Sequence, residues 1–415
     1  MTLSTQPVSE NMRRSVIVMG SNKEALNKSK EIYSKIGAIG DDLDLIDGFQ
    51  ASIPVSALES VYKSLPDGIT IVADTGYKIP TPIELTQDEP AKKFEPKLDV
   101  VKDLLGLGSV WDQGLTGKGV GLAVVDTGLF PHPDLADRIV AFKDMVDGKG
   151  WAFDDQGHGT HVAGDAASSG KLSGGRFKGP AYEANLIGVR VLNGDGAGTM
   201  SDIIKGIQWV VRNKEKDNIR VMNLSLGGSA YQLAKNDPVV IALERAAEAG
   251  IVPVIAAGNE GPGKSTLASP GIAPGVITVG AYDDKNTPDT SDDGIAKFSS
   301  RGPTLRDRFT KPDLVTPGVL ITAPVAYGSA LDHNPKVPHV TPDYIAISGT
   351  SMATPITAGL VLLMVQANPN LTTAQYKDVL KKSCNPLPGY DANTQGAGLP
   401  DIQKAIDMVR SMKSA

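Results

Sequence analysis

Hydrophobic and polar positions divide the chain into two parts with different patterns. In the first part, strands are predicted at 14–19, 44–53 and 69–73, and helices at 23–36 and 55–65. This β-α-β-α-β order predicts a small α+β domain. The segment 78–96 then carries four prolines with charges between them, which predicts a linker.

After the linker, apolar runs typical of buried parallel strands alternate with segments of helical spacing. The predicted strands are 120–125, 186–192, 221–226, 252–256 and 276–279, and the predicted helices are 200–212, 239–249 and two that begin at His158 and Ser351. Such alternation predicts an α/β fold, a doubly wound parallel sheet with helices on both faces. We therefore expect a domain over 1–80, a linker over 81–97 and an α/β domain over 98–415.

Composition excludes some classes of partner and agrees with a globular enzyme. The 415 residues are 41% hydrophobic and carry a net charge of −6 without a basic run, so we expect no nucleic-acid partner. We also expect no membrane partner. Cys384 is the one cysteine, which excludes an internal disulfide. The polar first twelve residues lack the apolar stretch of a secretory signal, so we expect a cytoplasmic protein, with removal of a leader or another export route as alternatives.

A histidine between two glycines is the most informative local pattern. Residues 157–164 are Gly-His-Gly-Thr-His-Val-Ala-Gly. The glycines allow a tight turn and the close approach of a partner side chain, and the small residues that follow let a helix pack closely against a sheet. His158 is therefore the candidate general base.

An aspartate and a serine occupy positions that complement this base. Asp126 follows the apolar run 121–125, at the carboxyl end of a predicted strand, where functional groups of parallel sheets gather. Ser351, in Gly-Thr-Ser-Met-Ala-Thr-Pro at 349–355, precedes a long apolar helix. A serine hydroxyl needs a base within hydrogen-bond reach, and the base needs a carboxylate that orients it. We predict these roles for Ser351, His158 and Asp126.

The chain order Asp, His, Ser is that of subtilisin, and these motifs resemble those of the subtilases, the subtilisin-like serine proteases. The resemblance covers residues 95–410 and includes Asn-Leu-Ser-Leu-Gly-Gly (223–228), Ala-Ala-Gly-Asn (256–259), Phe-Ser-Ser-Arg-Gly-Pro (298–303) and Lys-Pro-Asp (311–313). The Phe-Ser-Ser-Arg-Gly-Pro stretch and Ala-Ser-Ser-Gly (167–170) are similar to the AprX-type bacterial branch. The resemblance implies a subtilisin-like fold and a serine endopeptidase that works through an acyl-enzyme.

The resemblance also assigns the stabiliser of the tetrahedral intermediate. Asn259 corresponds to the oxyanion-hole residue of the family, together with the backbone N–H of Ser351. Because Ser351 begins a helix, the positive end of the helix dipole faces the developing negative charge.

Two backbone edges resemble the strands between which subtilases take a peptide as a third strand. One edge contains Gly196 and Ala197, and the other contains Ser225, Leu226 and Gly227. By the same resemblance, the pocket for the residue before the scissile bond has walls of small residues, which favour a large apolar or aromatic side chain. These walls are Ser225, Leu226, Gly227, Gly228, Ala256, Ala257 and Gly258.

The first 80 residues resemble a ferredoxin-like propeptide. Such a domain helps a subtilase to fold and then occupies its cleft, so the chain is expected to be a self-processing zymogen cut within 81–97. The protein's own propeptide is thus an expected partner in cis, besides protein or peptide substrates. An accessory domain of the same topology is the alternative.

Two places in the sequence have side chains of the type that bind metal ions. Asp134 resembles a calcium ligand of secreted subtilisins, but the loop 168–176, which supplies further ligands there, has no carboxylate, so we expect that site to be absent. The acidic residues at 283, 284, 289, 292 and 293 are either a cation site or a solvated loop. We expect catalysis without a cofactor and leave a structural calcium open. His132, His333 and His339 are expected to be solvated, and His161 to be packed structure.

Two other functions remain open. The same triad could serve an esterase or acyltransferase, although Ser351 lies in Gly-x-Ser-x-Ala rather than the Gly-x-Ser-x-Gly of a nucleophile elbow. The chain could also be an inactive subtilase-fold binding protein.

Overall fold

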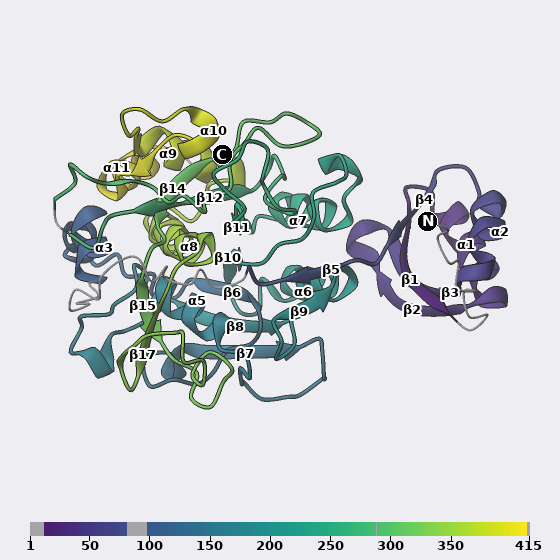
Figure 1. Cartoon of the computed structure of the whole chain (residues 1–415), viewed down its shortest axis with the longest axis horizontal. Helices are drawn as coiled ribbons and strands as arrows, with labels where there is room; N and C mark the ends of the chain where they lie inside the picture. Colours follow the sequence, from purple (N-terminus) through teal and green to yellow (C-terminus); the bar gives the residue numbers. More distant parts are fainter. Residues whose placement is uncertain (1–11, 81–97, 288, 413–415) are drawn as a thin grey trace, which may run out of the picture.

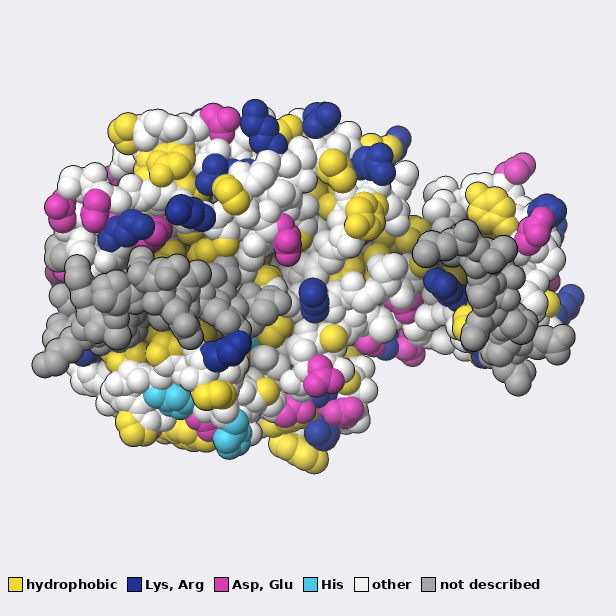
Figure 2. Space-filling view, in the orientation of Figure 1, with side chains coloured by type: hydrophobic (Ala, Val, Ile, Leu, Met, Phe, Trp, Pro, Cys, Tyr) yellow, Lys and Arg dark blue, Asp and Glu magenta, His cyan; other side chains and the backbone are white. Residues whose placement is uncertain are grey.

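The computed structural model describes residues 12–80, 98–287 and 289–412. A small N-terminal domain lies beside a large domain (Figure 1) and forms a separate lobe in the space-filling view (Figure 2). The predicted linker 81–97 lies outside the described residues.

The small domain is a four-stranded antiparallel sheet with two helices. Its elements are β1 (Arg13–Gly20), α1 (Lys23–Ile36), β2 (Ala38–Leu43), β3 (Gly48–Pro54), α2 (Leu58–Ser64) and β4 (Ile69–Ala73), with 3-10 turns at Asp44–Ile46 and Val55–Ala57. The strand order is β2-β3-β1-β4. Tyr33 of α1 is fully buried and packs edge-on against Phe49 of β3, with ring centroids 5.7 Å apart.

Two details of the predicted small domain are wrong. The strand predicted over 44–53 begins only at Gly48, because Asp44–Ile46 is a 3-10 turn. The strand β2 was not predicted, because five of its six residues are exposed and only Leu43 is buried. An edge strand that buries one side chain has no alternating pattern to reveal it.

The large domain is built on an eight-stranded, mostly parallel sheet. Its order is β13-β12-β11-β10-β6-β8-β7, with β14 paired to β12, and only β12 and β13 run antiparallel. The strands are β6 (Gly121–Asp126), β7 (Ile139–Asp144), β8 (Asn185–Arg190), β10 (Ile219–Leu224), β11 (Val252–Ala256), β12 (Ile277–Asp283), β13 (Gly294–Ile295) and β14 (Leu314–Pro317). This confirms the predicted doubly wound α/β fold.

Helices cover both faces of this sheet. Helices α5 (His158–Ala167) and α8 (Thr350–Ala367) pack on one face, and α6 (Met200–Asn213) and α7 (Pro238–Glu248) on the other. Side chains of β6 alternate accordingly. Leu122 and Val124 join the α5 and α8 core, while Ala123 and Val125 join the α6 and α7 core.

The remaining elements lie around this framework. They are α3 (Leu98–Leu104), α4 (Leu107–Trp111), β15 (Ile321–Pro324), β16 (His339–Thr341), β17 (Tyr344–Ile347), α9 (Thr373–Ser383), β18 (Cys384–Asn385), α10 (Ala392–Gln395), β19 (Leu399–Pro400), α11 (Ile402–Ser411) and 3-10 turns at Ala136–Arg138, Lys171–Ser173 and Ala234–Asn236. Among the described residues, α8 alone is long and apolar enough to cross a membrane, but 89% of that stretch is buried inside the protein. It is therefore the core helix against which the sheet packs.

One short strand connects the two domains. β5 (Gly76–Lys78) leaves the small domain, enters the large one and pairs antiparallel with β9 (Ala197–Thr199). The pairs are Gly76 with Thr199, Tyr77 with Gly198 and Lys78 with Ala197. Lys78, where the Pro-rich segment 78–96 begins, belongs to this strand and is not part of a linker, whereas the linker expected over 81–97 stays a prediction.

Candidate active site

Asp126 and His158 meet at the carboxyl end of the central sheet. Asp126 is the last residue of β6 and His158 the first of α5, and Asp126 Oδ1 lies 2.8 Å from His158 Nδ1. Gly157 has φ 105°, and a Cβ there would lie 2.5 Å from Ser329 Oγ. A Cβ on Gly159 would lie 2.2 Å from a backbone oxygen. Gly159 is therefore required by the close approach of α5 to the end of β6, and Gly157 by its positive φ and its contact with Ser329.

The charge of Asp126 changes the proton affinity of His158. Burial alone would lower the pKa of His158, but the negative charge and the hydrogen bond of Asp126 outweigh it, so the pKa is raised above its ordinary value. With Nδ1 held by Asp126, the Nε2 atom is the one available to a nucleophile.

A second carboxylate, which the sequence analysis missed, fixes the turn before His158. Asp154 Oδ1 accepts from the Gly157 N–H at 2.8 Å and from Thr127 Oγ1 at 2.9 Å, and Oδ2 accepts from Thr160 Oγ1 at 2.7 Å. Burial raises the pKa of Asp154, against the opposing effect of these hydrogen bonds. An acidic pair just before the Gly-His-Gly motif was the available signal for this role.

Ser351 lies in the first turn of α8, and α8 packs against α5. Its hydroxyl donates to the Ser225 carbonyl at 3.2 Å, and the Ser225 hydroxyl donates to the Ser351 carbonyl at 2.8 Å. Within the described parts of the chain, no hydrogen bond joins Ser351 to His158. The structure thus joins Asp126 to His158, and places Ser351 against Ser225 at the start of a neighbouring helix.

Asn259 is oriented by the residue before Ser351. Its Oδ1 accepts from both the backbone N–H and the hydroxyl of Thr350, each at 2.9 Å. Because these partners are donors, the amide nitrogen must face the other way. A Cβ on Gly349 would lie 3.2 Å from that nitrogen, so a side chain there would crowd it. Asn259 also lines a cavity, described below, that contains the predicted pocket residues Ala256 and Gly258. Its N–H groups can therefore donate hydrogen bonds to a negatively charged oxygen there.

The two predicted backbone edges lie on either side of the chain segment 76–79. The Lys78 N–H donates to the Gly227 carbonyl at 3.1 Å, and the Gly227 N–H donates back to the Lys78 carbonyl at 2.9 Å. The Ile79 N–H donates to the Gly196 carbonyl at 2.9 Å. Together with the pairing of β5 and β9, these bonds make the segment a central strand between the edges.

A cavity of about 610 Å³ lies beside this strand. Of the predicted binding residues, it is lined by Ala197, Leu226, Gly227, Gly228, Ala256 and Gly258, together with Asn259 and Pro80. Ala257 does not line it, because it is fully buried in the core formed with α6 and α7. Ser225 contacts Ser351 instead.

Both carboxylate oxygens of Asp134 accept hydrogen bonds from protein donors. Its Oδ1 accepts from the Leu172 N–H at 3.0 Å, and its Oδ2 accepts from Ser168 Oγ at 2.8 Å and Tyr344 Oη at 2.6 Å. His132 beside it is fully buried, so its predicted solvation is wrong. Across the described residues, no group of three or more His, Cys, Asp and Glu side chains could hold a metal ion.

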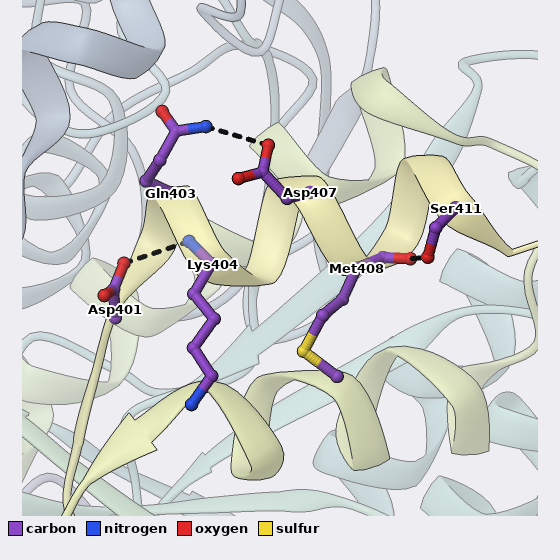
Figure 3. Close-up of a pocket in the computed structure, with 6 residues that line it drawn as sticks. All are labelled: Asp401, Gln403, Lys404, Asp407, Met408 and Ser411. Carbon is purple, nitrogen blue, oxygen red and sulfur yellow. Dashed lines mark hydrogen bonds between the residues drawn. The ribbon is translucent and has the colours of Figure 1, made fainter.

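A further hollow lies on the surface of α11, away from these residues (Figure 3). Its polar side chains come from one helix and bind one another, as where Gln403 Nε2 donates to Asp407 at 3.0 Å. No nucleophile and base face each other there.

Residues 117–398 match the subtilase family, Peptidase_S8, by sequence comparison. The chain is 50% identical over 300 residues to serine protease AprX of Bacillus subtilis (strain 168), covering 71% of this chain and 67% of that protein. It is 34% identical over 294 residues to subtilisin BL of Lederbergia lenta, covering 71% of this chain and 93% of that protein.

The fold is also similar to a solved structure, that of fervidolysin from Fervidobacterium pennivorans, described as a keratinolytic enzyme related to subtilisin. The TM-score is 0.73 at 23% identity, and the match covers 96% of this chain and 61% of the fervidolysin chain. At this identity the likeness concerns the fold alone.

Proposed function

Because this chain belongs to the subtilase family and is a subtilisin-like serine endopeptidase, we propose that Ser351, His158 and Asp126 are its catalytic triad and that it is made as a self-processing precursor. Proteins and peptides are its substrates. Catalysis by these groups requires no cofactor.

In the proposed reaction, the Ser351 hydroxyl turns from the Ser225 carbonyl toward His158 Nε2, which takes its proton as Oγ attacks the peptide carbonyl. Asp126, hydrogen bonded to Nδ1, stabilises the imidazolium that forms. Asn259 Nδ2 and the Ser351 N–H donate to the oxyanion. His158 then gives the proton to the leaving amine, and water hydrolyses the acyl-enzyme by the same steps.

The observation that carries the precursor proposal is the strand formed by residues 76–79. A peptide bound between two backbone edges presents its carbonyl groups in a fixed register, and here the chain itself takes that place. Pro80 follows this strand and lines the cavity that Asn259 also lines. We infer from this register that a productive complex presents the Pro80 carbonyl to Ser351, and that the small domain acts as an inhibitor in cis.

Contacts between the domains support this arrangement. Three acidic side chains of the small domain, Asp41, Asp44 and Asp47, form ion pairs with basic side chains of α6 and α7. The pairs are Lys205–Asp41 at 2.9 Å, Arg212–Asp44 at 2.6 Å and Arg245–Asp47 at 2.6 Å. Such complementarity orients one domain on the other, although each exposed pair contributes little stability.

The test compares the full-length chain with Ser351→Ala and with the control Ser229→Ala, a serine at the rim of the same cavity. We expect the wild type and the control to convert themselves to a form that starts between residues 80 and 100, shown by N-terminal sequencing, and to cleave casein. The Ser351→Ala chain should stay intact and inactive. An active wild-type enzyme that still starts near residue 1 would refute self-processing but not the triad.

The same samples test the alternatives. Cleavage of ester substrates without cleavage of casein or a chromogenic peptide would favour an esterase. Activity in the Ser351→Ala chain at a tenth of the wild-type rate would refute the triad.

A further inference from the structure

Residues 76–79 form the strand that lies between the two backbone edges, here called the cleft strand. Its most buried side chain is Tyr77. It is 3% exposed, although its neighbours Gly76 and Lys78 are exposed. Its ring lies against Gly228, where a Cβ would come within 3.2 Å of three ring atoms. The absence of a side chain at Gly228 therefore makes room for an aromatic ring.

The pocket around this ring ends in a polar pair. Tyr77 Oη lies 2.8 Å from Ser269 Oγ, and Ser269 Oγ donates to Asp237 Oδ2 at 2.6 Å. Because the one hydroxyl proton of Ser269 goes to the carboxylate, the phenol must donate to Ser269. The pocket thus has a hydrogen-bond acceptor where the hydroxyl group of a tyrosine lies. A phenylalanine ring would need no such acceptor.

Both members of this pair are fixed by the fold. Asp237 Oδ1 caps α7 by accepting from the Val239 N–H at 3.0 Å and the Val240 N–H at 3.3 Å. Ser269 is bound through its backbone to Gly228, by N–H to carbonyl bonds of 3.0 and 2.8 Å in the two directions. Asp237 and Ser269 are both buried, so no water competes freely for their hydrogen bonds. The acceptor is therefore preorganised before any peptide arrives.

The register of the strand shows which residue of a substrate would occupy this pocket. The proposed function puts the Pro80 carbonyl at Ser351, and in that register Tyr77 is the fourth residue before the bond that is cut. We propose that Ser269 and Asp237 select a tyrosine over a phenylalanine at the fourth position before the scissile bond in substrates of this enzyme. This specificity rests on the proposed function, because it assumes that substrates follow the path of residues 76–80.

The direct test uses the enzyme that the full-length chain produces and two chromogenic tetrapeptides that differ only in tyrosine or phenylalanine at the first residue. A neutral hydrogen bond of this kind should favour tyrosine about fivefold in kcat/KM. A third peptide with O-methyltyrosine has no proton to donate and should be cleaved no better than the phenylalanine peptide. Equal kcat/KM for tyrosine and phenylalanine would overturn the proposal.

The variant Ser269→Ala removes the acceptor and should bring the ratio of tyrosine to phenylalanine close to one. Its matched control is Ser229→Ala, which lies on the same cavity without touching the hydroxyl pair and should keep the wild-type ratio. An unchanged ratio in Ser269→Ala would overturn the role of Ser269. Loss of all peptide cleavage in the wild type would instead refute the proposed function.

A second measurement needs no activity. In the full-length Ser351→Ala chain, Tyr77→Phe, Ser269→Ala and the double substitution form a cycle whose unfolding equilibria are measured in urea. We expect Tyr77→Phe to favour unfolding about fivefold and Ser269→Ala to favour it more, because it also removes the hydrogen bond to Asp237. The double change should exceed the Ser269→Ala effect by less than twofold. Additive effects would show that the two side chains do not interact and would overturn the proposal.

Discussion

Asp74 holds the small domain onto the large one at a helix N-terminus, and its charge can be removed without changing its shape. Its Oδ1 accepts from the Ser201 N–H at 2.9 Å and its Oδ2 accepts from Ser201 Oγ at 2.8 Å. Ser201 lies in the first turn of α6, where backbone N–H groups lack helical partners. We predict that Asp74→Asn loosens the strand Gly76–Lys78, which follows two residues later.

The size of the effect follows from these contacts. A hydrogen bond to a charged group contributes about 1.5–3 kcal/mol, and a negative charge at a helix N-terminus about 0.3–1 kcal/mol. Asparagine keeps one acceptor oxygen and loses the charge, so the expected loss is about 2 kcal/mol, or roughly 30-fold in the opening equilibrium. The control Asp41→Asn removes an ion pair whose carboxylate is 58% exposed, which costs about 0–1 kcal/mol.

Hydrogen exchange in the full-length Ser351→Ala chain measures this opening. The Lys78 N–H donates to the Gly227 carbonyl, and the Gly227 N–H donates to the Lys78 carbonyl. Both amide hydrogens are therefore exposed to exchange with solvent when β5 leaves the cleft. We expect their exchange to be roughly 30-fold faster in Asp74→Asn and less than about fivefold faster in Asp41→Asn. Equal exchange in the two variants would refute the reasoning that Asp74 anchors the strand.

Four further predictions concern the catalytic groups and the fold. Asn259→Ala should lower kcat by about two to three orders of magnitude, the size known for subtilisin, with little change in KM, and steady-state kinetics on a peptide would check this. Because His158 must be neutral to act as the base and its pKa is raised, kcat/KM should rise with pH through an apparent pKa at or above the ordinary value of 6.5. In Asp126→Asn the remaining activity should be much lower and its midpoint should lie at lower pH, since the charge that raises this pKa is gone. A chelator should leave the thermal unfolding midpoint unchanged, because protein donors already satisfy the Asp134 oxygens; a lower midpoint would reveal a bound cation.

The sequence predicted the large sheet well because its strands are buried on both faces. Such strands are continuous apolar runs, and β6 and β11 were predicted within one residue of their ends. The strand β5 was not predicted, because it has no continuous apolar run. Gly76–Lys78 is a strand only because β9 and Gly227 supply hydrogen-bond partners, and no local pattern encodes partners more than a hundred residues away.

Candidate site residues also divide into those that a local motif reveals and those whose role depends on distant partners. His158 and Ser351 stand in motifs of glycine and small residues, which the local sequence displays. Thr350 and Ser225 position the site through hydrogen bonds to Asn259 and Ser351, which are 91 and 126 residues away along the chain, so their roles depend on the folded structure. The buried His132 was missed because a neighbouring proline suggested an exposed loop, whereas tyrosine rings enclose the imidazole.

The tethering of residues 76–80 determines how the proposed inhibition would depend on protein concentration. While residues 76–80 remain part of the same chain, their encounter with the cleft is intramolecular, and dilution cannot weaken it. If the chain is cut as proposed, binding of the small domain to the enzyme becomes bimolecular and obeys mass action. Dilution into a larger volume would then release activity from molecules that were silent in the concentrated sample.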